Sequence, residues 1–366
     1  MKLTHLLAKK LEIPFKFNFK HALADRTKTE TILVTATSSN KNVGYGEGCP
    51  RTYVTNESTD TSLNFIGEHR KQISEISTLQ DLQSFMDRYK KAINSNPAAW
   101  CAVEIALLDL LGKEEEQSVE DLLGLSELRN EFRYTAVIGD WDINTTKTFF
   151  EKFLSMGFKD FKLKLSGDLN QDSLKINVIR QSKRTDITLR VDANKLWESS
   201  EKALSYLSSL DCQFFGVEEP LEKFSYTDLM ELSKKLGAKI ILDESFKKIG
   251  DFDKLENRTD VFIINIRISK MGGILRSLGI AKIAAAKGFG IILGAQVGET
   301  SILTRAALPV ASTYSNNVIA QEGAFGEFLL ERDLCTPSIK FGAGGILQIS
   351  DYLEPNSYGL GLNIQG

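Results

Sequence analysis

Five charged side chains in the middle of the chain recur at regular intervals and could together carry out acid–base or metal chemistry. They are, in chain order, Lys162, Lys164, Asp192, Glu218 and Asp243. From Lys164 onward the intervals are 28, 26 and 25 residues, each about the length of one strand–helix unit. Each group ends a short apolar run, so we expect all of them at the C-terminal ends of parallel strands. In a (β/α)₈ barrel those ends form one face, on which the active site lies.

The three acids predict a metal site made only of oxygen ligands. Carboxylates are hard ligands that suit Mg²⁺, which would keep open positions for a substrate. A divalent ion also explains how three acids from adjacent strands could lie close together without strong mutual repulsion. Glu219 follows Glu218 directly, but neighbouring residues of a strand point to opposite faces, so the two glutamates cannot both be ligands. We expect Mg²⁺ as the cofactor of this site.

The two lysines stand two residues apart on one predicted strand, so their side chains share a face. Each positive charge disfavours the other, and one lysine could therefore have a lowered pKa and act as a base. A carbon acid next to a carboxylate is very weak, and its ene-diolate needs strong electrostatic stabilisation. Mg²⁺ would supply that stabilisation while a lysine takes the proton. The constellation therefore predicts an enzyme that removes a proton next to a substrate carboxylate.

Short apolar runs alternate with amphipathic stretches from about Tyr134 onward, which predicts the α/β class and a (β/α)₈ barrel. The eight runs are Tyr134–Ile138, Phe161–Leu165, Ile187–Val191, Phe214–Val217, Ile240–Leu242, Val261–Ile266, Ile291–Leu293 and Asn317–Ala320. Helical patterns lie between them, among them Gln171–Gln181, Glu201–Leu210, Tyr226–Leu236 and Gly273–Lys287. Gly288 directly follows the last of these and is expected to cap that helix.

The region before the barrel has a different pattern. Thr31–Thr37 is rich in β-branched residues and predicts a strand, whereas the glycines of Gly44–Pro50 (GYGEGCP) predict a loop. Ala98–Leu111 has helical periodicity, and Pro97 suits its start. We therefore divide the chain into an α+β unit at 1–125, a catalytic barrel at 126–335 and a C-terminal segment at 336–366.

Composition excludes several classes of protein. The net charge of −3 argues against a nucleic-acid-binding protein, and no apolar run is long enough for a secretion signal or a membrane helix. The four cysteines form no CxxC pair, which argues against a zinc site or a disulfide framework. All three histidines precede residue 70, so a barrel site cannot use a Ser–His–Asp triad. We expect a cytoplasmic enzyme with a small-molecule carboxylate substrate and no nucleic-acid or membrane partner.

In these motifs the chain resembles the muconate-lactonizing subgroup of the enolase superfamily, which includes the dipeptide epimerases. The resemblance covers nearly the whole chain and rests on a Gly-x-Gly-Glu turn, the Lys-x-Lys of FKLKLSG, and DANKLW, VEEP, LDES and INIRISKMGG in this order. It implies a modified barrel under a capping domain formed by both chain ends, and an isomerase such as a racemase, epimerase or cycloisomerase. The pairing of a lysine base with Mg²⁺ is general in that superfamily. A homo-oligomer is expected from the resemblance alone.

The resemblance also assigns roles residue by residue. It implies that the metal ligands are Asp192, Glu218 and Asp243. Lys164 would be the general base, and Lys162 would steady the substrate carboxylate. Specificity in the family depends partly on two segments of the capping domain. The residues in those segments that could hold a distal carboxylate or an aromatic group are Arg26, Arg51 and Tyr53.

Two departures from the family pattern bear on the chemistry. Arg267 stands where the family places a second catalytic lysine, and Lys270 matches the later lysine of that pattern. Arginine stays protonated and is a poor base, although it pairs well with an oxyanion or a carboxylate. This puts two-base epimerisation in doubt and leaves lactone formation or β-elimination open, with Arg267 or Lys270 facing the substrate opposite Lys164. Dipeptide epimerases carry an Asp-x-Asp at the eighth strand that holds an ammonium group, whereas here the only acid at that place is Glu322. In this respect the chain is more similar to the cycloisomerases.

Each assignment has a plainer alternative. The lysine pair could lie on the protein surface, Asp192 could cap a helix, and Arg267 could be a simple ion-pair partner. The segment Gly294–Thr300 could border the substrate or form an ordinary loop. For the whole protein the alternatives are a dehydratase or lyase that uses the same enolate step on a hydroxy or sugar acid, and a metal-binding barrel that binds a carboxylate without catalysis.

Overall fold

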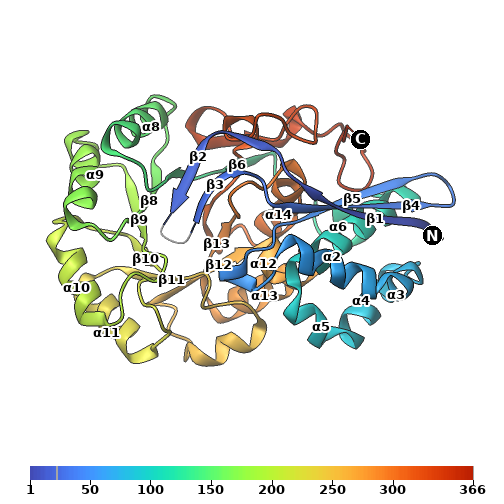
Figure 1. Cartoon of the computed structure of the whole chain (residues 1–366), viewed down its shortest axis with the longest axis horizontal. Coiled ribbons are helices and arrows are strands. Elements are labelled where there is room, and N and C mark those ends of the chain that lie inside the picture. Colours follow the sequence, from blue (N-terminus) through green and yellow to red (C-terminus); the bar gives the residue numbers. More distant parts are fainter. Residues whose placement is uncertain (22–23, 366) are drawn as a thin grey trace.

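The centre of the molecule is an eight-stranded parallel sheet that curls on itself (Figure 1). The computed structural model describes residues 1–21 and 24–365. The strands, in sheet order, are β7 (Ala136–Ile138), β8 (Asp160–Lys164), β9 (Thr188–Asp192), β10 (Gly216–Glu218), β11 (Lys239–Leu242), β12 (Phe262–Arg267), β13 (Gly290–Gly294) and β14 (Val318–Gln321). The two ends of the sheet meet where the Thr135 amide donates to the Gln321 carbonyl at 2.7 Å. The predicted barrel is therefore confirmed, with a strand at each predicted apolar run.

Helices follow the strands and cover the outside of the barrel (Figure 1). They are α8 (Ile143–Ser155), α9 (Leu169–Gln181), α10 (Ser200–Ser209), α11 (Tyr226–Leu236), the 3₁₀ turn η1 (Ile249–Lys254), α12 (Ile268–Met271), α13 (Ile274–Lys287) and α14 (Ser301–Thr313). Gly288 ends α13 with a left-handed φ of 81°, as predicted. The chain after β14 continues into the short η2 (Gly326–Phe328).

Strand register brings the charged residues of neighbouring strands together. On β8 and β9, Lys162 is paired with Arg190, and Lys164 is paired with Asp192. On β9 and β10, Asp192 is also opposite Glu218. Because side chains alternate along a strand, these residues all point to one face of the sheet. The other strands carry apolar residues in part of that face, where a separate buried cluster consists of Ile241, Ile263, Ile292 and Ala320.

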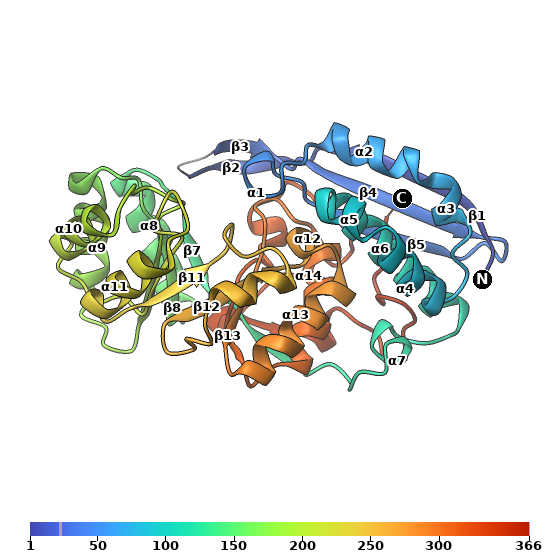
Figure 2. The same cartoon turned by 90° about the horizontal axis from the view of Figure 1, so that it is seen from below.

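The N-terminal region is a second layer of structure beside the barrel (Figure 2). Its antiparallel sheet consists of β1 (Leu3–Leu11), β4 (Thr31–Ser38) and β5 (Val43–Gly48). The helices of this region are α1 (Thr52–Thr55), α2 (Thr59–Glu68), α3 (Arg70–Ser74), α4 (Leu79–Arg88), α5 (Lys90–Ser95), α6 (Pro97–Glu114) and α7 (Val119–Leu122). The hairpin of β2 (Pro14–His21) and β3 (Ala24–Lys28) extends from the sheet toward the barrel.

The prediction of a loop at Gly44–Pro50 was wrong, because most of this segment is the strand β5. Its glycines allow close packing and not a turn: a Cβ on Gly46 would lie 2.0 Å from the Ala102 carbonyl oxygen of α6. Gly44 and Gly48 face the same helix at similar separations. The strand can therefore approach the α6 backbone only where side chains are missing.

The C-terminal tail returns to the N-terminal region. Its strand β15 (Ile346–Gln348) pairs with β6 (Glu131–Arg133); between η2 and the chain end lie two further turns, η3 (Ala343–Gly345) and η4 (Ile349–Asp351). The Leu360 amide donates to Asp109 of α6 at 2.8 Å. These contacts agree with a cap formed by both chain ends, while the boundaries at 125 and 335 stay a prediction. Along the described part of the chain, no helix combines the length and the apolar character that crossing a bilayer requires.

Candidate active site

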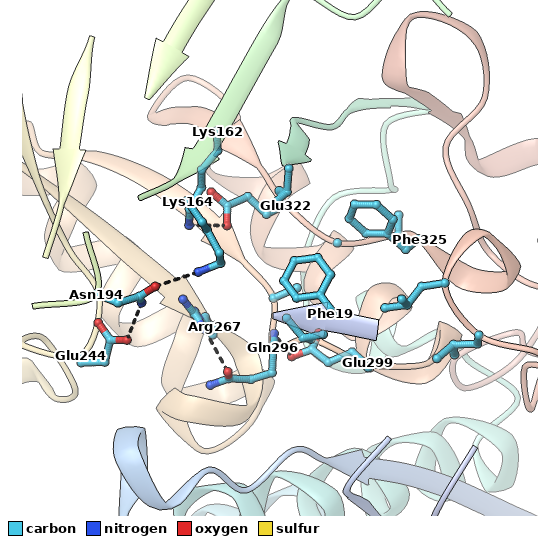
Figure 3. Close-up of a pocket in the computed structure, with 18 of the residues that line it drawn as sticks. Phe19, Lys162, Lys164, Asn194, Glu244, Arg267, Gln296, Glu299, Glu322 and Phe325 are labelled. Carbon is cyan, nitrogen blue, oxygen red and sulfur yellow. Dashed lines mark hydrogen bonds and ion pairs between the residues drawn. The ribbon is translucent and has the colours of Figure 1, made fainter. Parts of the chain in front are cut away.

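A cavity lies at the C-terminal ends of the barrel strands, under the β2–β3 hairpin (Figure 3). Its polar wall comes from the strand ends and includes Lys162, Lys164, Asn194, Glu244, Arg267 and Glu322. Its apolar wall includes Phe19, Val137, Phe325, Leu329 and Leu330. The structure thus places both lysines, Arg267 and Glu322 of the predicted site around one enclosed space.

Lys164 reaches the cavity from the end of β8. Its Nζ donates to Asp192 Oδ2 at 2.6 Å and to Asn194 Oδ1 at 3.0 Å. Asn194 in turn donates to Glu244 Oε1 at 3.4 Å, so the lysine is held by a chain of polar groups (Figure 3). Such contacts fix the position of the amine, as a general base requires.

Lys162 lies deeper in the barrel and is surrounded by acids. Its Nζ is 2.8 Å from Glu218 Oε2, 3.0 Å from Glu322 Oε2 and 3.4 Å from Asp192 Oδ2. Burial lowers the pKa of Lys162, but these three carboxylates raise it further, and the net result is a pKa above the ordinary value. Lys162 therefore keeps its proton, which suits a residue that holds negative charge.

The three predicted metal ligands lie on adjacent strand ends and are almost fully buried, but their carboxylates are turned toward cations. Asp192 forms an ion pair with Lys164, and Glu218 forms one with Lys162. Asp243 forms ion pairs with Arg267 and, at 2.8 Å, with Lys270. Within residues 1–21 and 24–365, no three His, Cys, Asp or Glu side chains stand together as a ready set of metal ligands. The cations occupy the space between the acids.

The acids nevertheless suit a hard cation. All their donor atoms are carboxylate oxygens, the ligands that Mg²⁺ prefers. Glu218 Oε2 makes no hydrogen bond, because Lys162 is close enough for an ion pair but is not aligned as a donor. Burial raises the pKa of Glu218 to about 8; Lys162 opposes this, and the charges of Asp192, Glu322 and Asp243 add to it. A divalent ion would relieve both the repulsion and the missing contact.

Arg267 and Lys270 have different surroundings. Arg267 lines the cavity at the end of β12, where Nη1 donates to Gln296 Oε1 at 2.9 Å and Nη2 pairs with Asp243. Lys270 is buried behind Asp243, with its Nζ 2.8 Å from Asp243 Oδ1, 2.6 Å from the Asp243 carbonyl and 2.8 Å from the Asn265 carbonyl. Of the two residues expected opposite Lys164, only Arg267 therefore faces the cavity, and Lys270 positions Asp243.

Glu322 is held between two cations on the end of β14. Besides Lys162, it accepts from Arg190 Nη1 at 2.9 Å. Arg190 also donates to Thr135 at 2.6 Å and to Asp160 at 3.1 Å, below the cavity. Sequence reasoning missed Arg190, although its place two residues before Asp192 is the signal that identified the lysine pair.

The residues expected to recognise the far end of a substrate divide into two groups. Arg51 is buried, and its guanidinium donates to the carbonyls of Glu30, Pro50 and Val297 at 2.7–2.9 Å. It therefore ties the N-terminal region to the segment after β13 and does not line the cavity. Tyr53 does line the cavity, and the Arg26 guanidinium, which also pairs with Glu30, lies 5.9 Å from the centre of its ring.

The segment Gly294–Thr300 borders the cavity with Gln296 and Glu299. Glu299 Oε1 accepts from the backbone amide of Gln296 at 2.7 Å. Burial raises the pKa of Glu299 to about 7, although Arg267 and Arg51 oppose the shift. Neither residue was singled out from the sequence, because a loop after a strand has no periodicity that shows which of its side chains turn inward.

Comparison with known proteins agrees with this arrangement. The family model described as "Mandelate racemase / muconate lactonizing enzyme, N-terminal domain" matches residues 7–124, and "Enolase C-terminal domain-like" matches residues 145–366. A hydrophobic dipeptide epimerase from Enterococcus faecalis is 26% identical over 96% of this chain and 97% of its own length. An N-succinyl-L-Arg/Lys racemase from Bacillus cereus is 26% identical over 80% of this chain and 78% of its own.

A third relative, a chloromuconate cycloisomerase from Cupriavidus pinatubonensis, is 26% identical over 70% of this chain and 68% of its own. The crystal structure of the Enterococcus faecalis dipeptide epimerase, complexed with Mg and L-Leu-L-Tyr, superposes with a TM-score of 0.85 at 25% identity, and covers 99% of this chain and 100% of that one. The chain therefore belongs to the mandelate racemase/muconate lactonizing enzyme family of the enolase superfamily, as an isomerase-type enzyme.

Proposed function

We propose that the protein is a Mg²⁺-dependent isomerase that removes the proton α to the carboxylate of a small substrate, with Lys164 as the base. The observation that carries this proposal is the position of Lys164 in the cavity, held by Asp192 and Asn194 at 2.6 and 3.0 Å. It stands next to three buried acids on consecutive strand ends. A base beside a site for a hard cation is what proton removal from a carbon acid requires.

The residues that would hold Mg²⁺ are Asp192, Glu218 and Asp243. When bound, Mg²⁺ would supply Lewis-acid stabilisation of the charge that develops on the substrate carboxylate. Lys162 adds a fixed positive charge beside the same acids, since its raised pKa keeps it protonated. Lys270 orients Asp243 through two short contacts and is itself anchored on the Asn265 carbonyl. Two of the relatives of known structure were complexed with Mg and a dipeptide, which supports the choice of metal.

Arg267 restricts the chemistry to one proton carrier. Burial lowers the pKa of Arg267, but Asp243, Glu244 and Glu218 raise it more, so that it lies above the high ordinary value of arginine. A guanidinium in this setting cannot accept a proton. Epimerisation needs a proton carrier on each face of the substrate, whereas lactone formation and similar isomerisations need one. We therefore propose one-base chemistry, and β-elimination by a lyase is the second candidate that the same residue favours.

The test is α-proton exchange followed by NMR. The enzyme with Mg²⁺ is incubated in D₂O with dipeptides, N-acyl amino acids, hydroxy acids and muconate-like lactones. Deuterium uptake with retention, or product formation without inversion, is the expected result. Lys164→Met should abolish it while the fold and Mg²⁺ binding remain, and Lys202→Met, which removes a lysine exposed on α10, serves as the control. Full exchange in Lys164→Met would refute the assignment, and Mg²⁺ binding without exchange on any ligand would favour the non-catalytic alternative.

We also propose, from the sequence alone, that the protein is a homo-oligomer and that it is cytoplasmic. A homo-oligomer would be tested by light scattering of the purified protein. A cytoplasmic location would be tested by fractionation of the producing cells.

A further inference from the structure

We propose that Arg267 and Gln296 form a second recognition site in the catalytic cavity, which binds a hydrogen-bond-accepting group on the substrate in addition to its reacting carboxylate. The accepting group is a second carboxylate or an acyl carbonyl, and not an ammonium group. The inference rests on the proposed function, since it assumes that the reacting carboxylate is bound beside Lys162 and Lys164. It adds the class of substrate, which the family does not determine.

The orientation of Gln296 follows from its partner. Arginine can only donate hydrogen bonds, so the Gln296 oxygen must face Arg267 Nη1, at 2.9 Å. The side-chain nitrogen of Gln296, Nε2, carries two N–H donors and therefore points away from Arg267. This nitrogen is buried and has no hydrogen-bond partner, while the side chain as a whole lines the cavity.

Arg267 also has an unused donor. Nη1 is taken by Gln296 and Nη2 by Asp243, but Nε is buried without an acceptor. A buried donor that lacks a partner is costly, and native proteins rarely keep one unless a ligand or water supplies the acceptor. Arg267 and Gln296 are hydrogen-bonded neighbours in one cavity, and each has such a donor. These donors therefore indicate a ligand group that carries an oxygen atom.

The acids of the cavity offer a poor site for an ammonium group. Glu322 is already paired with Lys162 and Arg190, at 3.0 and 2.9 Å. Glu299 Oε1 already accepts from the backbone amide of Gln296 at 2.7 Å, and burial raises the pKa of this carboxyl to about 7. The guanidinium of Arg267 keeps its positive charge, which favours an acceptor over an ammonium group at this place in the cavity.

Four small probes of similar length separate the alternatives. Pentanoate has only the reacting type of carboxylate, glutarate adds a second carboxylate, N-acetylglycine adds an acyl carbonyl, and 5-aminopentanoate adds an ammonium group. Binding is measured by calorimetric titration of the Mg²⁺-loaded protein. We expect glutarate, N-acetylglycine or both to bind about tenfold or more tightly than pentanoate, and 5-aminopentanoate to bind no better than pentanoate.

The decisive variant is Gln296→Glu. It keeps an oxygen for Arg267 but replaces the two free donors with a second oxygen, so it should abolish the preference for glutarate or N-acetylglycine over pentanoate. Gln80→Glu makes the same change of charge on the exposed face of α4 and is the control. Thermal unfolding of all variants shows whether the fold is retained.

Three results would overturn the inference. They are equal affinity of the wild type for pentanoate, glutarate and N-acetylglycine, a preference that survives Gln296→Glu, and tightest binding of 5-aminopentanoate that is lost in Glu299→Gln. If pentanoate binds only with Mg²⁺ but the preference is missing, this inference alone fails. If none of the probes binds, the proposed carboxylate site fails with it.

Discussion

Lys162→Met tests the charge balance of the site without knowledge of the substrate. The side chain is 2% exposed and its Nζ lies within 3.4 Å of three carboxylates. After the substitution, Glu322 keeps Arg190 at 2.9 Å. Glu218 keeps a hydrogen bond from Asn265 at 3.2 Å and, as its counter-charge, Arg267 at 3.6 Å. The variant therefore leaves a buried acid with one distant counter-charge.

Removing one partner of a buried ion pair costs about 3–5 kcal/mol, because the remaining charge is left without compensation. We expect a loss of this size in the free energy of unfolding when EDTA is present. The pKa of Lys162 is raised, so its stabilising contribution is fully present below the unfolded-state value of about 10.4 and is lost only as the pH rises through the folded value. Burial already raises the pKa of Glu218 to about 8 while Lys162 opposes the shift, so without Lys162 this carboxyl keeps its proton at pH 7. The loss should accordingly be smaller at pH 7 than at pH 9, where more of the uncompensated charge develops.

Mg²⁺ should reverse part of the loss. A ligand at about 100 times its dissociation constant stabilises the folded state by about 2.7 kcal/mol. The variant should gain more from Mg²⁺ than the wild type does, because in the wild type the ammonium of Lys162 competes for Glu218 and Asp192. The measurement is urea unfolding followed by circular dichroism, in EDTA and in excess Mg²⁺.

The matched control is Lys202→Met, which removes a lysine that pairs with Glu198 on the surface, where the two side chains are 62% and 70% exposed. Exposed pairs contribute about 0–1 kcal/mol, so this variant should unfold like the wild type. A Lys162→Met protein as stable as this control in EDTA would refute the electrostatic reasoning. An equal Mg²⁺ effect in the variant and the wild type would refute the proposed metal position.

Three further outcomes are expected. Arg267→Lys puts a side chain that can exchange its proton into the cavity, so deuterium uptake with inversion should appear by NMR; uptake with retention alone would count against one-base chemistry as the role of Arg267. Gly46→Ala places a Cβ 2.0 Å from the Ala102 carbonyl oxygen of α6 and should lower the free energy of unfolding in urea by about 1–3 kcal/mol or more. Its control is Gly67→Ala on α2, where a Cβ would have nothing within 4 Å; this variant should be as stable as the wild type or more stable by about 0.5–1 kcal/mol. Burial raises the pKa of Glu104 to about 8, so ionisation should destabilise the wild type as the pH rises from 5 to 8, and Glu104→Gln should show a shallower fall of the melting temperature; equal slopes would contradict the shift.

The barrel could be predicted because its signals are local. Each strand is a short apolar run that a helix follows, and that alternation is visible in the chain without any contact being known. The charged residues were found for the same reason, since Lys164 and Asp192 each end such a run. The N-terminal strand β5 was missed because the use of glycine at Gly46 depends on the backbone of α6, which lies more than fifty residues further along the chain.

By itself, then, the sequence determined the fold class, the family and which charged residues stand at the strand ends, because strand periodicity and spacing are properties of neighbours along the chain. Only the tertiary structure decided how those charges are partnered. It placed Lys270 behind Asp243, Arg51 on backbone carbonyls and Glu322 between Lys162 and Arg190. It also brought Gln296, in the loop after the seventh strand, to Arg267 at the end of the sixth. Such pairings join strands that are adjacent in the barrel but distant in the chain, and hydrogen-bond direction and burial, which set their chemistry, exist only once the barrel has closed.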